Sequence, residues 1–359
     1  MRALVGLVAL PDGALAPGRL VFSSTITEVD LSSGAPGGDY ILPGLIDLQV
    51  NGGGGIDVPR ATPSALGELA RRLALAGTTA FLPTAITAPL EELAQVERVV
   101  AEAIQSQRPP GAELLGLHLE GPFISPVRLG VHPQHALEPR GPALERIAAL
   151  ERLRLITMAP ELPGAPAAIQ ALRRRGVAVS LGHSDATLEQ TRAALAAGAG
   201  MFTHVFNAMR PLHQREPGIV GAALAPGSAF AGLIADGVHL HPEIVRLLYR
   251  ARGAGGLLLT SDSVAPASLE PAPPPAIGAH RIGARLAGSL ITMLDGLRFM
   301  VEKVGAGVGE AALMAATNPA RVLALEERGR IAPGTRADLL VLDRQLRLKA
   351  VFLGGEELS

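Results

Sequence analysis

Four polar residues, each at the end of an apolar run, are of types that could together form a catalytic site. His183 ends VAVSLGH, His204 ends GMFTH, Glu120 ends LLGLHLE and Asp262 ends GLLLTSD. Two imidazoles and one carboxylate supply three ligands to a tetrahedral metal ion and leave one position open, which is the pattern of catalytic metal sites. Asp262 is not needed as a ligand and suits a general base. Together they predict metal-assisted hydrolysis.

Each of these residues also has an ordinary structural interpretation. A single histidine at a strand end is often a hydrogen-bonded side chain, and Glu120 alone could be a solvated loop carboxylate. Asp262 lies in Ser261-Asp262-Ser263, which is also typical of a turn or a helix N-cap. The four residues share one position relative to their apolar runs, and this coincidence favours a common site.

The elements that would position these residues are short apolar runs that alternate with helical segments. The expected strands are residues 45–51, 78–86, 114–122, 153–160, 177–183, 200–206, 230–239 and 256–262. Eight strands alternating with helices predict an α/β fold, a (β/α)8 barrel. In such a barrel the carboxyl ends of all strands meet at one mouth, so the four residues would face one another there.

Capping signals place several of the helices between these strands. Thr62-Pro63 is an N-cap and first-turn pair that opens a helix ending at Gly77. The segment between His183 and His204 is expected to be helical from about residues 184–185 to Gly198, supported by the capping-box pattern Thr187-x-x-Gln190. The other expected helices are 90–107, 143–152, 242–252, 289–304 and 309–325, with a hairpin at 281–288.

The two ends of the chain have a different pattern, with short strands and turns and no helical periodicity. We expect residues 1–42 and 327–359 to form one small β domain, and residues 43–326 to form the barrel. The first sixteen residues imitate a secretory signal, with one arginine, an apolar run and Ala14-Leu15-Ala16. The turn signal Pro11-Asp12-Gly13, followed by a strand-like segment at 18–29, favours a β-hairpin instead.

Composition excludes several classes of function. The chain has 359 residues and a net charge of −1, so it lacks the excess of basic residues typical of nucleic-acid binding. Aromatic residues make up 3% and tryptophan is absent, which argues against a stacking platform. The absence of cysteine leaves histidine and carboxylate as metal ligands and is compatible with the cytoplasm. The most apolar later window, 218–235, contains Pro226 and several glycines, so we expect no membrane span.

Seven segments together resemble a known family. LPGLIDLQVNG, GLHLEGPF, LGHSDAT, THVFNAM, REPGIVG, IADGVH and TSD are similar to signature segments of the N-acetylglucosamine-6-phosphate deacetylases, within the amidohydrolase superfamily. The resemblance runs from Leu42 through the C-terminal NPAR and GRIAPGTRADLLVLD segments. It implies a (β/α)8 barrel with a small β-sandwich built from both chain ends. It also implies hydrolysis of N-acetyl-D-glucosamine 6-phosphate to D-glucosamine 6-phosphate and acetate, in amino-sugar catabolism or recycling.

The resemblance assigns roles to individual residues. It implies the metal ligands Glu120, His183 and His204, and Asp262 as catalytic base and acid. The implied substrate contacts are His132 near the acetamido group and, for the rest of the sugar phosphate, Asn207, Ala208, Arg215, Asp236, His239, Leu286, Ala287 and Gly288. Without the family, Arg215 could equally be part of a surface pair with Glu216, and His132 or His239 an ordinary loop histidine.

Three departures from the family pattern bear on these roles. Gln49-Val50-Asn51 stands where amidohydrolases have His-x-His, and amides are poor ligands for a transition metal. We therefore expect one divalent ion per chain, Zn²⁺ first, with Fe²⁺, Mn²⁺, Co²⁺ or Ni²⁺ as alternatives. Ala287 replaces a serine of the family. The loop after Glu120 lacks the Lys-Gly-Ala-His segment, although His132 keeps the family spacing.

Two other functions stay open on the sequence alone. One is a cyclic amidase of the dihydroorotase or hydantoinase type, which normally uses His-x-His and often a carboxylated lysine. The other is a non-catalytic barrel that binds a sugar phosphate, from which one would expect a ligand or Asp262 to be missing. The resemblance further implies a homodimer in which the phosphate site is completed across the interface.

Overall fold

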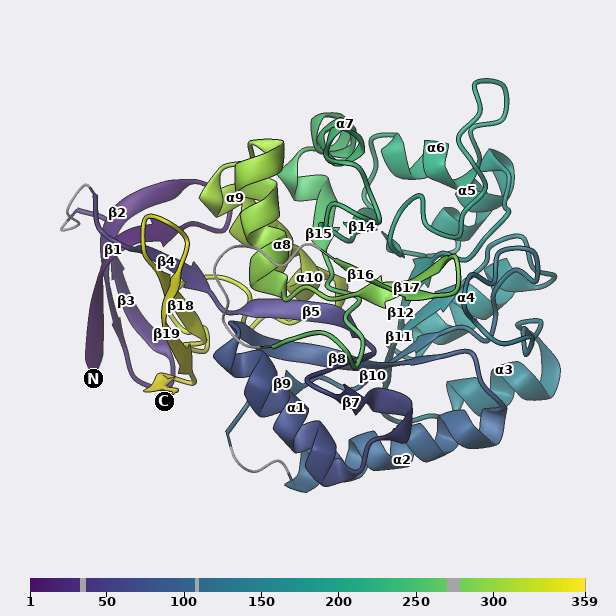
Figure 1. Ribbon diagram of the computed structural model, residues 1–359, viewed down its shortest axis with the longest axis horizontal. Helices are drawn as coiled ribbons and strands as arrows, with labels where there is room; N and C mark the ends of the chain where they lie inside the picture. The colour runs from purple at the N-terminus through teal and green to yellow at the C-terminus, as the bar shows by residue number, and fades with distance from the viewer. Residues whose placement is uncertain (33–36, 107–109, 270–277, 359) are drawn as a thin grey trace.

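The computed structural model describes residues 1–32, 37–106, 110–269 and 278–358. Its centre is a sheet of parallel strands that curves into a nearly closed barrel (Figure 1). Each of the eight expected runs contributes one strand of the barrel in chain order, which confirms the (β/α)8 prediction. The barrel strands are β5 (Leu45–Val50), β8 (Thr78–Ile86), β10 (Leu117–Glu120), β11 (Leu153–Met158), β12 (Ala178–Leu181), β13 (Met201–Phe202), β14 (Phe230–Leu233) and β15 (Leu257–Leu259).

The barrel closes where β15 meets β5, and this seam differs from the others. The other neighbouring strands pair through parallel ladders. Between β15 and β5 there is one isolated bridge, from Val50 to Ser263, beyond the end of β15. The amide of Asp262 donates to the Gln49 carbonyl at 3.0 Å, and the amide of Asn51 donates to the Ser263 carbonyl at 2.8 Å. The closing contacts therefore lie at the mouth of the barrel.

The barrel interior changes from apolar to polar along the strands. One buried cluster contains alternate residues of neighbouring strands, among them Leu82, Leu155 and Leu258, and α10 adds Ala320. Two residues further along the same strands are buried threonines, Thr84, Thr157 and Thr260. Because alternate residues of a strand share a face, the mouth side of the interior is lined by polar groups.

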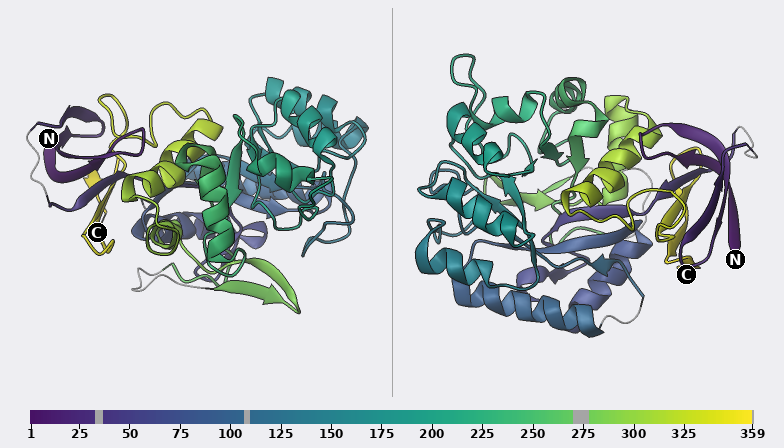
Figure 2. Two further views of the ribbon diagram at one scale, coloured as in Figure 1. Left: turned by 90° about the horizontal axis from the view of Figure 1, so that it is seen from above. Right: turned by 180° about the vertical axis from the view of Figure 1, so that it is seen from behind.

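Helices cover the outside of the barrel, and their apolar faces form the largest buried cluster with the strands (Figures 1 and 2). The described helices are α1 (Pro63–Leu75), α2 (Leu90–Ser106), α3 (Gly141–Ala148), α4 (Ala165–Arg174), α5 (Leu188–Ala196), α6 (Gly218–Leu224), α7 (Pro242–Arg252), α8 (Met293–Phe299), α9 (Val308–Ala312) and α10 (Asn318–Val322). Two π-helical segments, Met300–Val304 and Leu313–Thr317, continue α8 and α9. Short 3₁₀ turns lie at Val58–Arg60 and Ala254–Gly256.

Capping interactions at the N-termini of α1, α5 and α8 define where these helices begin. The Thr62 hydroxyl accepts from the amide of Ala65, as an N-cap of α1 should. The capping box of Thr187 and Gln190 is present, so α5 starts at Leu188 and the expectation of a start near residues 184–185 was wrong. Thr292 and Asp295 form a further capping box, so α8 starts at Met293 instead of residue 289.

Two other expected elements differ in their limits. The expected strand at 114–122 is divided into β9 (Glu113–Leu114) and β10, with Gly116 at a φ of 131° between them. The helix expected at 143–152 is α3, which ends at Ala148. The predicted hairpin is present as β16 (Ala279–Ile282) and β17 (Arg285–Ser289), which project from the barrel in light green in Figure 2. A second small hairpin joins β6 (Gly52–Gly53) and β7 (Ile56–Asp57).

The two chain ends form one seven-stranded sheet beside the barrel, as expected (Figure 1). Its strands, in spatial order, are β20 (Glu356–Glu357), β19 (Leu348–Leu353), β18 (Leu339–Leu342), β4 (Tyr40–Pro43), β1 (Arg2–Ala9), β2 (Leu15–Phe22) and β3 (Ile26–Asp30).

The small domain has its own core, in which the two flanks of the sheet meet. The rings of Phe22 and Phe352, from strands that are not neighbours in the sheet, pack edge to face at 5.3 Å. The sheet therefore folds over on itself as a small sandwich. β1 and β2 form the expected N-terminal hairpin. The exact domain boundaries at residues 42 and 327 stay a prediction.

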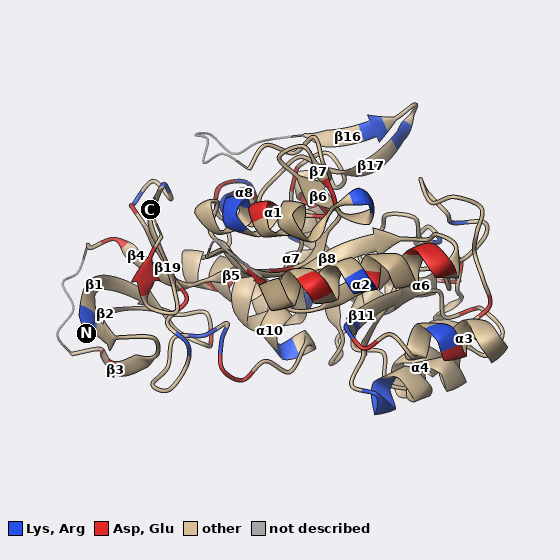
Figure 3. Cartoon of the chain, turned by 90° about the horizontal axis from the view of Figure 1, so that it is seen from below, with Lys and Arg blue, Asp and Glu red and all other residues tan. Residues whose placement is uncertain are grey.

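The charged residues are spread over the outer helices and both chain ends, with the two signs interspersed (Figure 3). Within the described part of the chain, every helix falls short of the length and apolarity that crossing a membrane would require.

Candidate active site

The Glu120 carboxylate, at the end of β10, is the centre of a buried polar cluster. Its Oε1 atom lies 2.8 Å from His204 Nε2 and 3.2 Å from His183 Nε2. Its Oε2 atom lies 3.4 Å from Nε2 of His132, a residue of the loop that follows β10. All four side chains are almost completely buried. Residues far apart in the chain thus meet because three strands and one loop end at the same mouth.

The histidines and Asp262 have an unusual backbone conformation. His183, His204 and Asp262 have φ values of 48°, 29° and 51°, in the left-handed region that residues other than glycine seldom adopt. Such conformations persist where the surrounding structure enforces them, and they concentrate at functional sites. All three residues follow the end of a barrel strand, so this turn directs each side chain. The sequence contained no signal for it.

His183 has a hydrogen bond that defines which of its nitrogens can bind a cation. Its Nδ1 atom lies 3.0 Å from the carbonyl oxygen of Arg128. Because a carbonyl oxygen only accepts, Nδ1 carries the hydrogen, and the neutral ring has its lone pair at Nε2. This lone pair faces Glu120 Oε1, itself an acceptor, at 3.2 Å. Two facing acceptors are stabilised by a cation between them.

The separation of these two atoms also fits a metal ion. Ligands of a tetrahedral zinc ion, each about 2.0–2.1 Å from the metal, lie roughly 3.3 Å apart. The carboxylate and imidazole donors suit zinc and other divalent first-row metals. The residues present therefore fit a divalent metal, with Glu120 and His183 as two of its ligands.

The third ligand can come from either of two histidines. The ligand atoms of Glu120, His132 and His183 all lie within 4.8 Å of one another. His204, the predicted ligand, joins the cluster through Glu120, and its ring centre lies 5.1 Å from that of His183. His132, a predicted substrate contact, is held through Nδ1 by the Thr87 hydroxyl at 2.9 Å. The structure thus brings together all three predicted histidines without ranking them.

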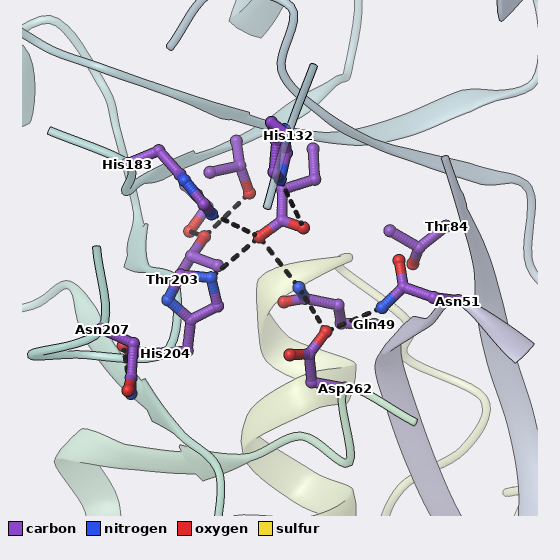
Figure 4. A network of polar contacts seen from close by, with 12 residues as sticks. Gln49, Asn51, Thr84, His132, His183, Thr203, His204, Asn207 and Asp262 are labelled. Carbon is purple, nitrogen blue, oxygen red and sulfur yellow. Dashed lines mark hydrogen bonds and ion pairs between the residues drawn. The ribbon is translucent and has the colours of Figure 1, made fainter. Parts of the chain in front are cut away.

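Asp262 lies across the site from the histidines (Figure 4). Its Oδ1 atom accepts hydrogen bonds from Gln49 Nε2 at 2.9 Å and from Asn51 Nδ2 at 2.7 Å. Gln49 Nε2 also donates to Glu120 Oε1 at 2.9 Å. The two amides that replace the His-x-His pattern therefore present N–H groups to the carboxylates. Their own oxygens, Oε1 and Oδ1, are buried and have no hydrogen-bond partner among the described residues.

Comparison with known proteins provides the family. The model of the amidohydrolase family matches residues 40–358, nearly the whole chain. This chain belongs to the amidohydrolase family.

Its relatives include proteins of defined activity. The chain is 38% identical over 350 residues to the N-acetylglucosamine-6-phosphate deacetylase of Rattus norvegicus, covering 89% of this chain and 83% of the relative. It is 36% identical over 331 residues to the N-acetylgalactosamine-6-phosphate deacetylase of Escherichia coli O157:H7, covering 89% and 87%. Among solved structures, an aspartate-to-alanine variant of the Mycobacterium smegmatis N-acetyl-D-glucosamine-6-phosphate deacetylase in complex with N-acetyl-D-glucosamine-6-phosphate superposes with a TM-score of 0.85. The two chains are 32% identical over 99% of this one and 98% of the other.

In the metal-free protein, the two carboxylates of this site differ in their pKa values. Burial raises the pKa of Asp262 to about 8, and the nearby charge of Glu120 adds to this rise. Burial acts in the same direction on Glu120, but the close approach of His132, His183 and His204 holds its pKa well below the usual range. Carboxylates whose pKa values are driven apart in one site are typical of acid–base catalysis. Burial also lowers the pKa of His132 to about 4, an effect to which His183 contributes.

Two groups of predicted substrate contacts have defined local structures. His239 Nδ1 lies 2.7 Å from Asp236 Oδ2, and both side chains are buried in the loop after β14. This contact leaves Nε2 of His239 as the ring nitrogen available to a ligand. Asn207 and Ala208 lie directly after His204, where Asn207 Nδ2 donates to the His204 carbonyl at 3.1 Å and Ala208 has a φ of 50°.

The remaining predicted contacts lie outside the cluster. Leu286, Ala287 and Gly288 are in β17 of the projecting hairpin. Arg215 is exposed in the loop after β13, where its backbone amide donates to Nδ1 of His213 at 3.2 Å. The structure of the single chain does not bring Arg215 to the histidines.

A charged cluster beside His183 was not predicted from the sequence. Arg128 donates to Asp185 Oδ1 through Nε at 2.8 Å and Nη2 at 2.6 Å, and Arg210 Nη2 donates to Asp185 Oδ2 at 2.9 Å. These bonds tie together the loops after β10, β12 and β13, and Arg128 also supplies the carbonyl that orients His183. The residues belong to three separate segments, so no local sequence pattern would have revealed the cluster.

Proposed function

We propose that this amidohydrolase removes the acetyl group of N-acetyl-D-glucosamine 6-phosphate, producing D-glucosamine 6-phosphate and acetate in amino-sugar catabolism or recycling. The observation that carries the proposal is the convergence of Glu120, His183 and His204 opposite Asp262 at the mouth of the barrel. The relatives named for this activity match nearly the whole chain and support the choice of substrate.

We assign Glu120, His183 and His204 as ligands of one divalent ion, Zn²⁺ in the first instance. When bound, such an ion polarises a carbonyl oxygen and makes water a better nucleophile at neutral pH. Gln49 and Asn51 support a single ion, because their amide N–H groups point at the carboxylates. Imidazole ligands in their place would present lone pairs.

Asp262 acts as the base and then the acid of the reaction. Gln49 and Asn51 hold its Oδ1 atom, which leaves Oδ2 to take a proton from the attacking water. Addition of the oxygen to the acetamide carbon produces a tetrahedral carbon. Transfer of the proton from Asp262 to the nitrogen then allows the C–N bond to break, releasing acetate and the amine. His132, held by Thr87, positions the acetamido group.

The phosphate is bound at the rim of the barrel. Arg215 and His239 contact its oxygens, because guanidinium and imidazole N–H groups are good oxyanion donors. Asn207, Ala208, Asp236 and the segment Leu286–Gly288 contact the sugar. Since Arg215 is exposed and remote from the cluster of its own chain, we propose a homodimer in which Arg215 completes the partner's site. We place the enzyme in the cytoplasm, and we retain residues 1–42 with 327–359 and residues 43–326 as its two domains.

The direct test is acetate release by the purified, metal-loaded protein. N-Acetylglucosamine 6-phosphate is the expected substrate, and the same sugar without phosphate is the control. The proposal predicts a much higher kcat/KM for the phosphorylated sugar. It fails if a cyclic amide such as dihydroorotate or a hydantoin is hydrolysed instead, or if the sugar phosphate binds without acetate release.

The C4 epimer is a second candidate substrate. The relative from Escherichia coli O157:H7 is named for N-acetylgalactosamine 6-phosphate and matches this chain over a similar length. The two sugars differ at C4, which lies between the acetamido and phosphate ends that the assigned residues contact. Measuring kcat/KM for both sugar phosphates in the same assay decides between them.

A further inference from the structure

The seam between β15 and β5 contains one buried carboxylate, Asp47, that none of the roles above uses. Asp47 lies in β5, two residues before Gln49, and is completely buried. The ladder that joins the other barrel strands is replaced at this seam by contacts around residues 49–52 and 262–263. The Asp47 side chain supplies additional links across the seam, just below these contacts.

Both oxygens of Asp47 accept hydrogen bonds from the segment that precedes Asp262. Oδ1 accepts from the Thr260 hydroxyl at 3.0 Å and from the Ser261 amide at 3.2 Å. Oδ2 accepts a short hydrogen bond from the Ser261 hydroxyl. Oδ1 also accepts from the amide of Gln49 at 3.2 Å. One carboxylate therefore binds the strand that carries Gln49 and the strand end that carries Asp262.

The other side of this strand end is held by Ser289. Its amide donates to the Asp262 carbonyl at 2.8 Å, and its hydroxyl donates to the Ser261 carbonyl at 2.5 Å. Asp262 itself has a φ of 51°, a conformation that must be enforced from outside. The side chains of Asp47 and Ser289 hold Ser261 from two sides. They thereby fix the position of the backbone that leads into Asp262.

We propose that Asp47 is a positioning residue for the reaction: it fixes the Thr260–Ser261 segment so that Asp262 and Gln49 keep their relative placement. The proposal rests on the role of Asp262 proposed above. A carboxylate suits this task because it accepts on both oxygens, whereas an amide in the same place accepts on one and carries two hydrogens on the other. Those hydrogens would face the donors of Ser261.

The test compares Asp47→Asn with Thr260→Val, which removes one donor to Asp47 and keeps the shape of the side chain. We expect kcat for acetate release to fall about 10–100-fold in Asp47→Asn, since a displacement of about 1 Å at a reacting group can cost 10²-fold. Thr260→Val should cost about 2–10-fold, as expected for one lost hydrogen bond. In both variants we expect KM to stay within about twofold, because the substrate contacts lie elsewhere, and the metal content to be unchanged. If Asp47→Asn does not fold, Thr260→Val is judged by the same criteria.

Thr79→Val is the matched control. The Thr79 hydroxyl donates to the Leu45 carbonyl across the neighbouring β5–β8 seam and is equally buried. Losing it should lower the free energy of unfolding without changing kcat. Hydrogen–deuterium exchange gives a readout that is independent of activity and metal. The amides of residues 257–263 should exchange faster in Asp47→Asn than in the wild type or in Thr79→Val.

A double-mutant cycle with Asp262→Asn decides whether Asp47 acts through Asp262. If it does, adding Asp47→Asn to Asp262→Asn causes little further loss of kcat. An equal fractional loss in both backgrounds, or a wild-type kcat in Asp47→Asn, would overturn the proposal while leaving Asp262 as the base. Full turnover in Asp262→Asn alone would instead remove the base assignment itself.

Discussion

The two sides of the candidate active site present opposite hydrogen-bonding character to the same carboxylate. On one side, the Nε2 atoms of His183 and His204 lie within 3.2 Å of Glu120 Oε1. On the other, the amide of Gln49 donates an N–H to the same oxygen, and Gln49 and Asn51 both donate to Asp262. The histidine side fits a cation, and the amide side already satisfies the carboxylates by hydrogen bonds.

This difference supports the proposed arrangement, in which one metal ion lies on the histidine side and Asp262 stays free to act as the base. In a site with ligands on both sides, the aspartate would be drawn toward a second ion. Here Asp262 is held by two neutral amides and keeps one oxygen available. We therefore expect substitutions on the histidine side to lower the content of bound metal. Substitutions on the amide side should lower turnover but leave the metal bound.

The largest effect is expected from His183→Asn. Loss of this ligand should deplete the bound metal and lower kcat/KM by more than about 10⁴-fold, beyond the 10²–10⁴-fold that loss of acid–base catalysis alone costs. Elemental analysis and acetate release after purification measure both effects. His241→Asn is the control, because His241 caps α7 at the surface and asparagine is a good N-cap. Full metal content in His183→Asn would contradict the ligand assignment.

Asp262→Asn should lower turnover without removing the metal, and so distinguish the amide side from the histidine side. We expect turnover to fall by roughly 10²–10⁴-fold, because the amide cannot accept a proton from water, while the metal stays bound. The control is Asp343→Asn, at a half-buried carboxylate of the small domain that pairs with Arg347. Near-normal turnover in Asp262→Asn, or loss of metal together with turnover, would show that the two sides are not divided in this way.

Arg215 lies on neither the histidine side nor the amide side of the candidate active site. Its loss should therefore affect only phosphate recognition. Losing one charge-assisted hydrogen bond costs about 1.5–3 kcal/mol, or roughly 10–100-fold in kcat/KM. We expect this loss for the phosphorylated sugar in Arg215→Ala, and little change for the plain sugar. Arg250→Ala, on the exposed face of α7, is the control.

Mixed dimers locate the Arg215 that completes each site. If it comes from the partner, mixing Arg215→Ala with Asp262→Asn protomers should restore part of the activity. The shared-site proposal is abandoned if demonstrated mixed dimers show no recovery, and equal losses on both sugars would mean that Arg215 supports the fold.

The smallest effect is a dependence of stability on pH in the metal-free protein. Burial raises the pKa of Asp262 from 3.8 to about 8. Between these values the folded protein binds a proton that the unfolded chain has lost, so this group's contribution to stability is present below pH 4 and is lost as the pH rises through 8. In Asp262→Asn this loss of stability is absent. We therefore expect the Tm of the variant minus the Tm of the wild type to increase by about 2 °C or more from pH 5 to pH 9. A constant difference would contradict the raised pKa.

Much of the fold and of the site could be predicted because the information is local. Apolar runs of strand length, capping pairs such as Thr62-Pro63 and Thr187-x-x-Gln190, and a polar residue at the end of each run need only neighbouring residues. The convergence of Glu120, His183, His204 and Asp262 at one mouth was therefore predictable from their positions, since parallel strands bring their carboxyl ends together.

Other features depend on contacts between distant segments and left no local pattern. The bonds of Arg128 and Arg210 to Asp185 join three loops. The hydroxyl of Thr87 meets His132 across 45 positions of the chain. The left-handed backbone at His183 is enforced by its surroundings, since histidine adopts this conformation only occasionally. The place of His132 inside the histidine cluster likewise follows from how its loop folds back over the barrel.

Elemental analysis of the metal-loaded protein, together with anomalous scattering from its crystals, tests the proposed single-metal site. We expect one divalent ion per chain, bound by Glu120, His183 and His204, with Asp262 still hydrogen-bonded to Gln49 and Asn51. Two ions at full occupancy with Gln49 or Asn51 in contact would contradict it. So would a single ion that binds His132 in place of His204.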